Sequence, residues 1–420
     1  MDLILKNVGV LATPIGSTAR RGISQQEILM IKNAEIGIEN GMISCISSNR
    51  DQNPLIEQNS KTQIIDCEKK LVTPGLIDAH THLVFGGWRQ NELKMKLEGK
   101  SYLDILKSGG GILSTVEQTR NASEEELFES GNRHLNEMMK LGVTTCEIKS
   151  GYGLNKKDEL KQLRVIRELN NNQPIDIVST FMGAHAIPKE FKDNRTGYIN
   201  LLTNEILPAV AEEKLAEFCD IFCETSVFTP DESLRILLEA KKYGLIPKIH
   251  ADEINPIGGA EIAAQVNAIS AEHLIQISDK GMREMSVNNV IAVLLPATSF
   301  YLDKPYARSR DIIDSNIPVA IATDFNPGSS PSLNMQFIMN LACLKYKMRP
   351  SEALTAATLN GAAAINRAER CGSIETGKQA DLVIWDAPDL DYIFYRYGSN
   401  LAHMIIKNGV PVHTKTGEDE

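Results

Sequence analysis

Hydrophobic and polar positions alternate differently in different parts of the chain. Up to about residue 72, short strand-like stretches are separated by turns, as at residues 2–8, 34–39 and 63–66. Beyond this point, short apolar runs alternate with stretches of helical periodicity, which is typical of a parallel sheet built from β–α–β units. Strand-like stretches return near the end, at residues 380–385 and 403–407. The simplest arrangement is a β module formed by both ends of the chain, with a second domain inserted into it.

Eight apolar runs can be counted in the inserted region. They lie at residues 76–82, 143–149, 175–181, 220–224, 245–250, 268–272, 290–295 and 318–323. Helix-patterned stretches separate them, for example at residues 156–169, 231–243 and 256–265, and the last such helix spans residues 351–366. Eight parallel strands with intervening helices favour a closed (β/α)8 barrel, whose active site lies at the C-terminal ends of the strands.

These patterns predict an α/β protein: a (β/α)8 TIM-type barrel with a small composite β-sandwich domain formed by both chain ends. The expected boundaries place residues 1–72 and 372–414 in the composite domain and residues 73–371 in the barrel. Residues 415–420 then form a short acidic tail.

Two histidines close the first apolar run, at residues 74–82 (PGLIDAHTH). In a strand, residues i and i+2 project from the same face, so His80 and His82 can point into one cavity. Such a pair also arises by chance, but the fifth run ends in His250 and the eighth is followed by Asp324. Three imidazoles and one carboxylate suit Zn or Fe better than Mg or Ca and leave room for a water molecule. We therefore predict one Zn or Fe ion per chain.

The other strand ends of the predicted barrel are also unusually polar. They carry the segments 147–153 (EIKSGYG), 183–185 (GAH), 250–253 (HADE), 272–273 (EH) and 324–330 (DFNPGSS). Gathering so many polar side chains at a barrel mouth is costly unless they bind something. The mouth is therefore expected to hold a small polar ligand.

Composition narrows the classes of partner. The 420 residues carry a formal net charge of −10, which leaves no basic surplus to neutralise a nucleic acid. No apolar run is long enough to cross a membrane, and the N-terminus lacks a secretory pattern. Seven scattered cysteines do not form a disulfide framework, so we expect reduced thiols in a cytoplasmic protein.

Several of these motifs together resemble a known family. PGLIDAHTH with the later His and Asp residues resembles the amidohydrolase superfamily, and residues 372–386 (GSIETGKQADLVIWD) are similar to its composite domain. More narrowly, residues 82–89 (HLVFGGWR), 181–185 (FMGAH) and 323–330 (TDFNPGSS), with EIKSGYG and HADE, resemble the imidazolonepropionase family. The resemblance covers nearly the whole chain. It implies metal-dependent hydrolytic ring opening of 4-imidazolone-5-propanoate to N-formimidoyl-L-glutamate in histidine degradation, by a homodimer.

The resemblance also implies roles for individual residues. It assigns a mononuclear metal site to His80, His82, His250 and Asp324. It assigns substrate contacts to Arg89, Tyr152, His185, Glu253, Asn326, Gly328 and Ser329.

The chemistry of these residues fits such a reaction. Opening a cyclic amide needs an activated water, a polarised carbonyl and a proton for the departing nitrogen. A metal ion lowers the pKa of bound water, and Asp324 can take its proton and pass it to that nitrogen. His273 can orient the hydroxide or stabilise the oxyanion, and Glu253 can hydrogen-bond a ring N–H. Arg89 can hold the propanoate through a bidentate fork, assisted by backbone N–H groups of residues 326–329.

Alternative interpretations remain at several positions. Arg89 could be a surface cation, Tyr152 a packing residue and His273 a structural histidine, while Glu224 could bridge a second metal. Another cyclic amidohydrolase or deaminase, such as a dihydroorotase-like enzyme, is an alternative function, and a non-catalytic scaffold is a remote one. Arg89 with Tyr152 and His185 favours a small anionic ring. The glycines at 109–111 match no nucleotide-binding pattern and suit a mobile loop.

Overall fold

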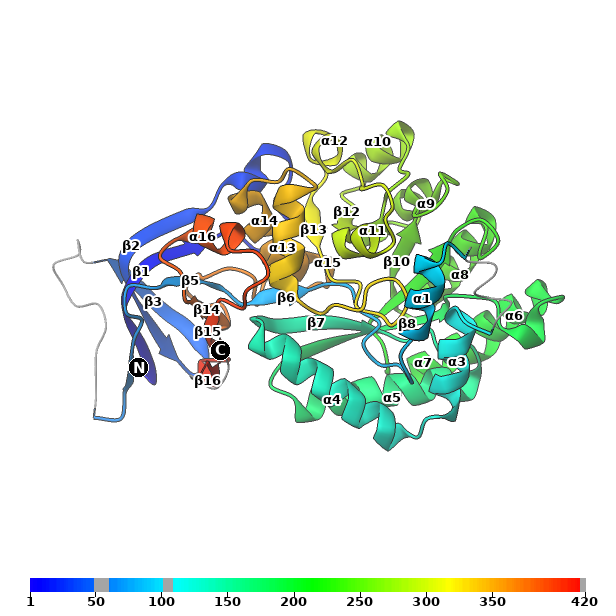
Figure 1. The fold of residues 1–420 in the computed structure, drawn as a ribbon, viewed down its shortest axis with the longest axis horizontal. Helices are drawn as coiled ribbons and strands as arrows, with labels where there is room; N and C mark the ends of the chain where they lie inside the picture. The colour runs from blue at the N-terminus through cyan, green and yellow to red at the C-terminus, as the bar shows by residue number, and fades with distance from the viewer. Residues whose placement is uncertain (49–59, 101–108, 416–420) are drawn as a thin grey trace.

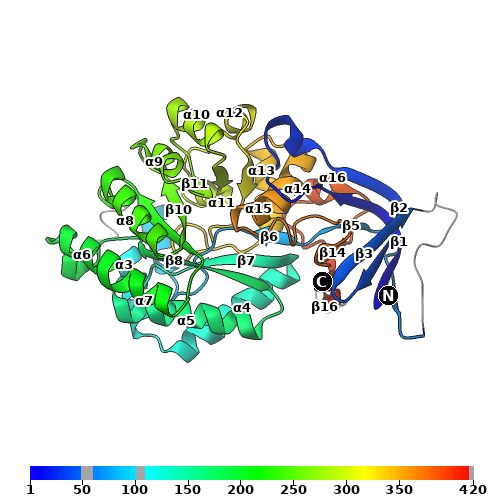
Figure 2. The ribbon, with the colours of Figure 1, turned by 180° about the vertical axis from the view of Figure 1, so that it is seen from behind.

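The computed structural model describes residues 1–48, 60–100 and 109–415, which form two eight-stranded sheets. Figures 1 and 2 show the sheet built from both chain ends beside the barrel that the middle of the chain forms. The predicted fold class is confirmed. The domain boundaries at residues 72/73 and 371/372 stay predictions, and residues 416–420 of the predicted acidic tail (415–420) lie outside the described residues.

The barrel strands run parallel in sequence order, from β6 to β13. They are β6 Leu76–Asp78, β7 Val143–Lys149, β8 Asp176–Ala184, β9 Phe218–Cys223, β10 Ile246–Ala251, β11 Ser270–His273, β12 Ile291–Leu294 and β13 Val319–Ile321. Most of their residues are buried, because helices cover the outer face and side chains fill the interior.

The barrel closes beyond the ends of its first and last strands. A parallel bridge joins Thr81 to Phe325. The amide of His82 donates to Phe325 O at 2.9 Å, and that of Asp324 donates to His80 O at 3.0 Å. The segments that carry the predicted metal ligands therefore form the closing seam of the barrel.

Helices lie around the barrel and at its ends (Figure 1). They are α1 Asn91–Leu97, α3 Ile112–Asn121, α4 Glu124–Lys140, α5 Lys156–Asn172, α6 Arg195–Leu201, α7 Leu207–Glu212, α8 Pro230–Lys242, α9 Gly259–Gln265, α10 Asp279–Val287, α11 Pro296–Tyr301, α12 Ser309–Asp314, α13 Met335–Leu344, α14 Pro350–Ala357 and α15 Leu359–Ala364. Local sequence sets their ends: Thr229 and Glu232 form a capping box at the start of α8.

The composite sheet is mixed and takes strands from both ends of the chain. Its order is β16-β15-β14-β5-β1-β2-β3, and β4 pairs with β1. The strands are β1 Leu3–Thr13, β2 Leu29–Glu39, β3 Met42–Ser48, β4 Gln63–Asp66, β5 Leu71–Pro74, β14 Leu382–Trp385, β15 Ala402–Lys407 and β16 Val410–Thr414. The short helix α16 Leu390–Tyr395 connects β14 and β15. An apolar cluster that includes Leu5, Leu11, Val72, Leu382 and Ile406 forms its core.

Two further expectations concern the whole chain. In the described ranges, no helix combines the length and apolar character that a membrane span requires. All seven cysteines are free thiols, as predicted.

Candidate active site

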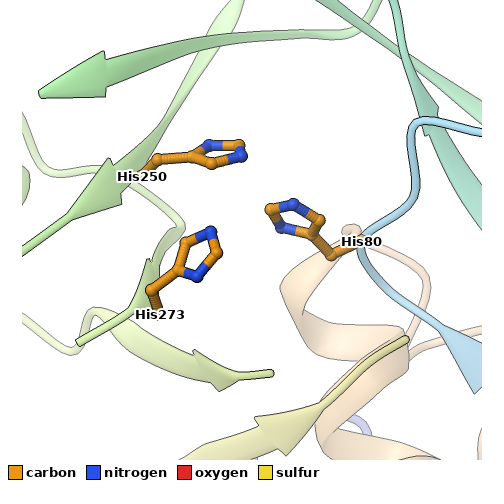
Figure 3. Close-up of side chains that lie close together, drawn as sticks. All are labelled: His80, His250 and His273. Carbon is orange, nitrogen blue, oxygen red and sulfur yellow. The ribbon is translucent and has the colours of Figure 1, made fainter. Parts of the chain in front are cut away.

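Five side chains able to bind a metal ion meet at the mouth of the barrel. His80 and His82 follow β6, His250 lies in β10, His273 ends β11, and Asp324 follows β13. All five residues are buried. Figure 3 shows His80 projecting toward His250 and His273 from the opposite side of the barrel. The strand ends therefore converge as the sequence predicts.

The ligand-capable atoms lie at separations suited to a single small cation. Nε2 of His250 is 3.4 Å from Nε2 of His82. Oδ1 of Asp324 is 3.4 Å from Nε2 of His80 and 3.6 Å from Nε2 of His82. Ligands of a tetrahedral zinc ion, each about 2.0–2.1 Å from the metal, are about 3.3–3.4 Å apart. Nε2 of His80 is buried and has no hydrogen-bond partner among the described residues. These four residues fit a bound metal ion.

His273 borders the same space. Nitrogen atoms of His80, His250 and His273 lie within 4.8 Å of one another, so His273 could also reach a cation. Burial lowers the pKa of His273 to about 3, which keeps its imidazole neutral. Its Nε2 lies 3.7 Å from Oε2 of Glu253. The position suits either a further ligand or a neutral group beside the reacting atoms.

Carboxylates lie behind two of the imidazoles. Nδ1 of His80 contacts Oε2 of Glu272, and Nδ1 of His250 lies 3.0 Å from Oδ2 of Asp220. A carboxylate at Nδ1 fixes the tautomer that leaves Nε2 free for a metal, and it orients the ring. The contacts therefore prepare His80 and His250 as ligands.

Two lysines, Lys149 and Lys248, accompany these carboxylates inside the barrel. The sequence analysis placed Lys149 at a strand end, within EIKSGYG, but assigned a role to neither lysine. Lys149 and Lys248 are fully buried, as are Glu147, Asp220 and Glu272. Burial alone would lower the pKa of Lys149, but the three carboxylates raise it above its usual value. The available signal was spacing: Glu147 and Lys149 are two residues apart in one strand, which puts both on the inner face.

Thr298 orients the predicted carboxylate ligand. Its hydroxyl, in α11, donates to Oδ2 of Asp324 at 2.6 Å, so Oδ1 faces the histidines. Burial alone would raise the pKa of Asp324, but its contact with His80 and the hydrogen bond from Thr298 hold it at about 2. Asp324 is therefore ionised at neutral pH. Sequence analysis did not predict Thr298, since an apolar run followed by PATSFY carries no distinctive chemistry.

Tyr152 and His185 lie beside His82. The rings of His82 and His185 stack, with centroids 4.8 Å apart and an interplanar angle of 17°. The centroid of Tyr152 is 5.4 Å from that of His185. Burial lowers the pKa of His185 to about 3, so its imidazole is neutral. Tyr152 is tilted by 49° against His185, so the three rings form an angled aromatic wall beside the predicted metal ligands.

Helix α5 holds the loop that carries Tyr152. Oε1 of Glu159 accepts the N–H groups of Gly153 and Leu154, each at 2.8 Å. Oε1 of Gln162 accepts the N–H of Tyr152 at 3.0 Å. Neither Glu159 nor Gln162 was predicted, because helical periodicity alone does not distinguish a buried polar residue from a solvated one.

Glu253 lies in the loop after β10, opposite His273. Burial and the nearby charges of Asp324 and Glu224 raise the pKa of Glu253 to about 8. Without a cation nearby, the carboxyl group is thus largely protonated at neutral pH and can donate a hydrogen bond. A bound metal ion opposes this shift.

Glu224 supports that loop. Its Oε2 accepts the N–H groups of Ile254 at 2.8 Å and Asn255 at 3.1 Å. Among the described residues it belongs to no group able to hold a metal. The interpretation of Glu224 as a bridge to a second metal therefore has no support.

Arg89 is held in a fixed orientation rather than exposed as a surface cation. Its Nε and Nη2 donate to the two carboxylate oxygens of Glu92 at 2.8 and 2.9 Å. Only 11% of its side chain is exposed. Nη1 lies over Gly328, where a Cβ atom would come within 2.1 Å of it. Arg89 therefore joins the first loop of the barrel to the last.

The loop at residues 326–329 is braced from within. Oδ1 of Asn326 accepts the N–H groups of Gly328 at 2.8 Å and Ser329 at 2.7 Å. These two N–H groups, expected to assist an anion, are thus already paired. The Nδ2 of Asn326 donates to Asp324 O at 2.6 Å. Asn326 therefore shapes the loop beside Asp324, and Ser329 and Gly328 lie where the sequence predicts, at the mouth.

A buried cluster of imidazoles and carboxylates at the C-terminal mouth of a (β/α)8 barrel defines the class of metal-dependent barrel hydrolases. The model of the amidohydrolase family matches residues 71–412. A protein of Alkaliphilus metalliredigens named imidazolonepropionase is 50% identical to this chain, over 97% of this chain and 97% of its own length. One of Bacillus velezensis with the same name is 49% identical over 99% of this chain and 98% of its own.

The fold comparison agrees with this class. An adenosine deaminase from Xanthomonas campestris, solved with bound Zn, has a TM-score of 0.69 at 18% identity, covering 98% of this chain and 92% of its own. At that identity, the likeness shows the fold alone. The chain belongs to the amidohydrolase family and, within it, to the imidazolonepropionases.

Proposed function

We propose that the barrel mouth opens the ring of 4-imidazolone-5-propanoate by hydrolysis, giving N-formimidoyl-L-glutamate. The carrying observation is that Nε2 of His80, His82 and His250 and Oδ1 of Asp324 converge with separations of 3.4–3.6 Å between the measured pairs. In the reaction, the oxygen of water joins the ring carbonyl carbon, the amide C–N bond breaks, and the departing nitrogen takes a proton. The names of the near full-length relatives support this choice of ring.

The proposed cofactor is one Zn or Fe ion per chain, held by His80, His82, His250 and Asp324. When bound, the ion supplies Lewis acidity, which polarises a carbonyl and lowers the pKa of a water molecule. The donor set and the Zn reported in the similar deaminase support a borderline metal.

Proton handling falls to Asp324, His273 and Glu253. The ionised carboxylate of Asp324 takes a proton from the attacking water and delivers it to the leaving nitrogen. His273 is neutral, so it can donate one N–H to the developing oxyanion. Oε2 of Glu253 lies 3.7 Å from Nε2 of His273, where its carboxyl group can hydrogen-bond a ring nitrogen.

The remaining residues hold the substrate. Arg89 binds the propanoate, while Tyr152 and His185 lie against the ring, His185 being stacked on His82. Gly328 leaves room for the guanidinium of Arg89, and Ser329, whose hydroxyl accepts from Nδ2 of Asn326 at 2.9 Å, contacts the substrate from the same loop.

A neutral ring is the main alternative substrate. A related deaminase or dihydroorotase-like hydrolase would use the same metal site, and Arg89 distinguishes the two because a positioned guanidinium suits an anion. A non-catalytic scaffold has no evident need for a converging set of buried imidazoles, whose desolvation is costly without a ligand.

Metal analysis combined with a turnover assay tests the proposal. Purified protein should contain one metal ion per chain and should decrease the absorbance of freshly prepared imidazolonepropanoate. His80→Ala should abolish turnover and lower metal content while leaving far-ultraviolet circular dichroism unchanged, since the ligands lie at the mouth and not in the packed interior. Protein without metal that turns over substrate, or two tight ions per chain, would contradict the proposal.

We also propose that the chain is a cytoplasmic homodimer that binds a small anion and neither nucleic acid nor membrane. The dimer rests on family resemblance. Light scattering should report about twice the chain mass of 46.3 kDa, and a mass near that of one chain would contradict it.

A further inference from the structure

Contacts through the barrel interior join two of the proposed metal ligands. Nδ1 of His80 contacts Oε2 of Glu272, and Nδ1 of His250 lies 3.0 Å from Oδ2 of Asp220. Nζ of Lys149 lies 3.1 Å from that same oxygen of Glu272 and 2.8 Å from that same oxygen of Asp220. The imidazoles come from opposite parts of the barrel, yet one ammonium group links them from behind.

The site around Lys149 is built to hold an ammonium group. Its third contact is Oε2 of Glu147 at 2.8 Å. An ammonium has three donors, and here each one faces a carboxylate. A fully buried lysine is costly unless all its donors are paired, so the position requires this complete set of partners. The same carboxylates also belong to groups with His80 and His250 that could hold a metal ion. In this structure the ammonium group of Lys149 lies among these carboxylates.

We propose that Lys149 is a positioning residue: by holding Glu272 and Asp220 together, it sets the orientation of His80 and His250 for metal binding. The inference rests on the metal site of the proposed function. Losing a partner that orients a metal-bound histidine typically weakens metal binding by about 10- to 100-fold.

Lys248 provides a matched control. It is equally buried and lies 3.0 Å from Oε1 of Glu147 and 3.1 Å from Oε1 of Glu272. It therefore belongs to the same cluster but contacts the oxygen of Glu272 that faces away from His80. Replacing either lysine by methionine removes the same charge, but only at position 149 does it cut the link between the imidazoles.

The experiment measures metal binding in the full chain after removal of metal. Zn²⁺ alone is titrated against a chelating dye, and the visible spectrum of the Co²⁺-loaded protein reports ligand geometry. Lys149→Met should bind Zn²⁺ about 10- to 100-fold more weakly than the wild type and change the Co²⁺ spectrum. Lys248→Met should stay close to the wild type in both. Equal losses in the two variants, or no change in Lys149→Met, would overturn the inference. If the wild type binds no metal, the proposed function itself fails.

A second pair of variants applies if circular dichroism shows that Lys149→Met does not fold. Lys149→Gln removes the charge but keeps two N–H donors for the carboxylates, and Lys248→Gln makes the same change outside the link. Weaker Zn²⁺ binding by Lys149→Gln than by Lys248→Gln, by about tenfold or more, supports the positioning role. Equal affinities overturn it, because cluster charge alone would then account for the effect.

Discussion

Among single residues, Arg89 has the most direct bearing on substrate choice. Glu92 holds two of its three nitrogen atoms, and the guanidinium fits against Gly328 because that residue has no Cβ. A guanidinium held in this way loses little side-chain freedom when it binds an anion. The residue is therefore prepared for a carboxylate before the substrate arrives.

Arg89→Ala should selectively weaken catalysis on the anionic substrate. Leaving the partner of a desolvated charge pair unpaired costs about 2–5 kcal/mol, which lowers kcat/KM by a factor of roughly 30 to several thousand. A ring analogue that carries a neutral amide in place of the propanoate should lose far less. Steady-state kinetics on both compounds measures the difference.

Two further variants separate an anion clamp from general disorder of the loop. Glu92→Gln keeps the cation but removes the charge that orients it, so it should reproduce only part of the Arg89→Ala defect. Asp324→Asn should abolish turnover of both compounds, since its role does not depend on the side chain of the ring. Equal damage by Arg89→Ala to charged and neutral compounds would refute the clamp.

At the scale of secondary-structure elements, periodicity in the sequence predicted the strands and helices whose sequences carry strong local signals. β7 has the predicted bounds 143–149, and α8 begins at Pro230, one residue before the predicted start, because a capping box and a proline mark its first turn. The helix predicted at 351–366 is instead two helices, α14 and α15, separated at Thr358. Its hydroxyl bonds back to Leu354 O at 2.6 Å, and no apolar period reveals such a break.

The residues of the candidate site also fall into two groups, those that the sequence could predict and those that it could not. His80, His82, His250 and Asp324 could be predicted because their residue types are distinctive and the barrel brings strand ends together. Residues that act on them through tertiary contacts could not, as Thr298 shows: it reaches Asp324 from a different strand end, and only the closed barrel creates that contact.

Glu159 offers a test of how one element supports the site. Glu159→Gln keeps its shape and an oxygen for the two backbone N–H groups, but it replaces a buried carboxylate acceptor by a neutral amide oxygen. Hydrogen bonds to a charged group contribute about 1.5–3 kcal/mol and those to a neutral group about 0.5–1.5 kcal/mol, so the variant should lose about 1 kcal/mol of stability. Urea unfolding should show this loss, and kcat/KM should fall because the Tyr152 loop is released, while metal content should not change.

Glu168→Gln is the control on the same helix. Glu168 is exposed, and surface substitutions usually stay within about 0.5 kcal/mol. If both glutamate variants behave alike, the loop does not depend on Glu159.

On the scale of the whole molecule, an ion pair between Lys407 and Asp176 joins the composite sheet to the barrel. Nζ of Lys407, in β15, lies 2.8 Å from Oδ2 of Asp176 at the start of β8 and 2.7 Å from Oδ2 of Asp381. The chain ends thus close on the side of the barrel opposite its mouth, because β8 begins there and ends near His185. The metal site and the Lys407–Asp176 ion pair lie at opposite ends of the barrel, so the ion pair can be weakened without touching the ligands.

The stability of the Asp176→Asn variant, measured as a function of pH, tests this separation. Burial alone would raise the pKa of Asp176, but Lys407 and Gln379 lower it below its usual value. A lowered pKa in the folded state adds stability above the unfolded value of about 3.9, and this is lost as the pH falls through the folded pKa. The variant should therefore be less stable than the wild type by about 1 kcal/mol at pH 7, a modest figure because 38% of the side chain is exposed. The difference in stability should shrink below about pH 4.

Urea unfolding across this pH range measures the difference, with the exposed Asp193→Asn as control. A stability difference that does not depend on pH would mean that Asp176 acts through its shape and not through its charge. A lowered metal content at pH 7 would show that the Lys407–Asp176 ion pair and the metal site are coupled.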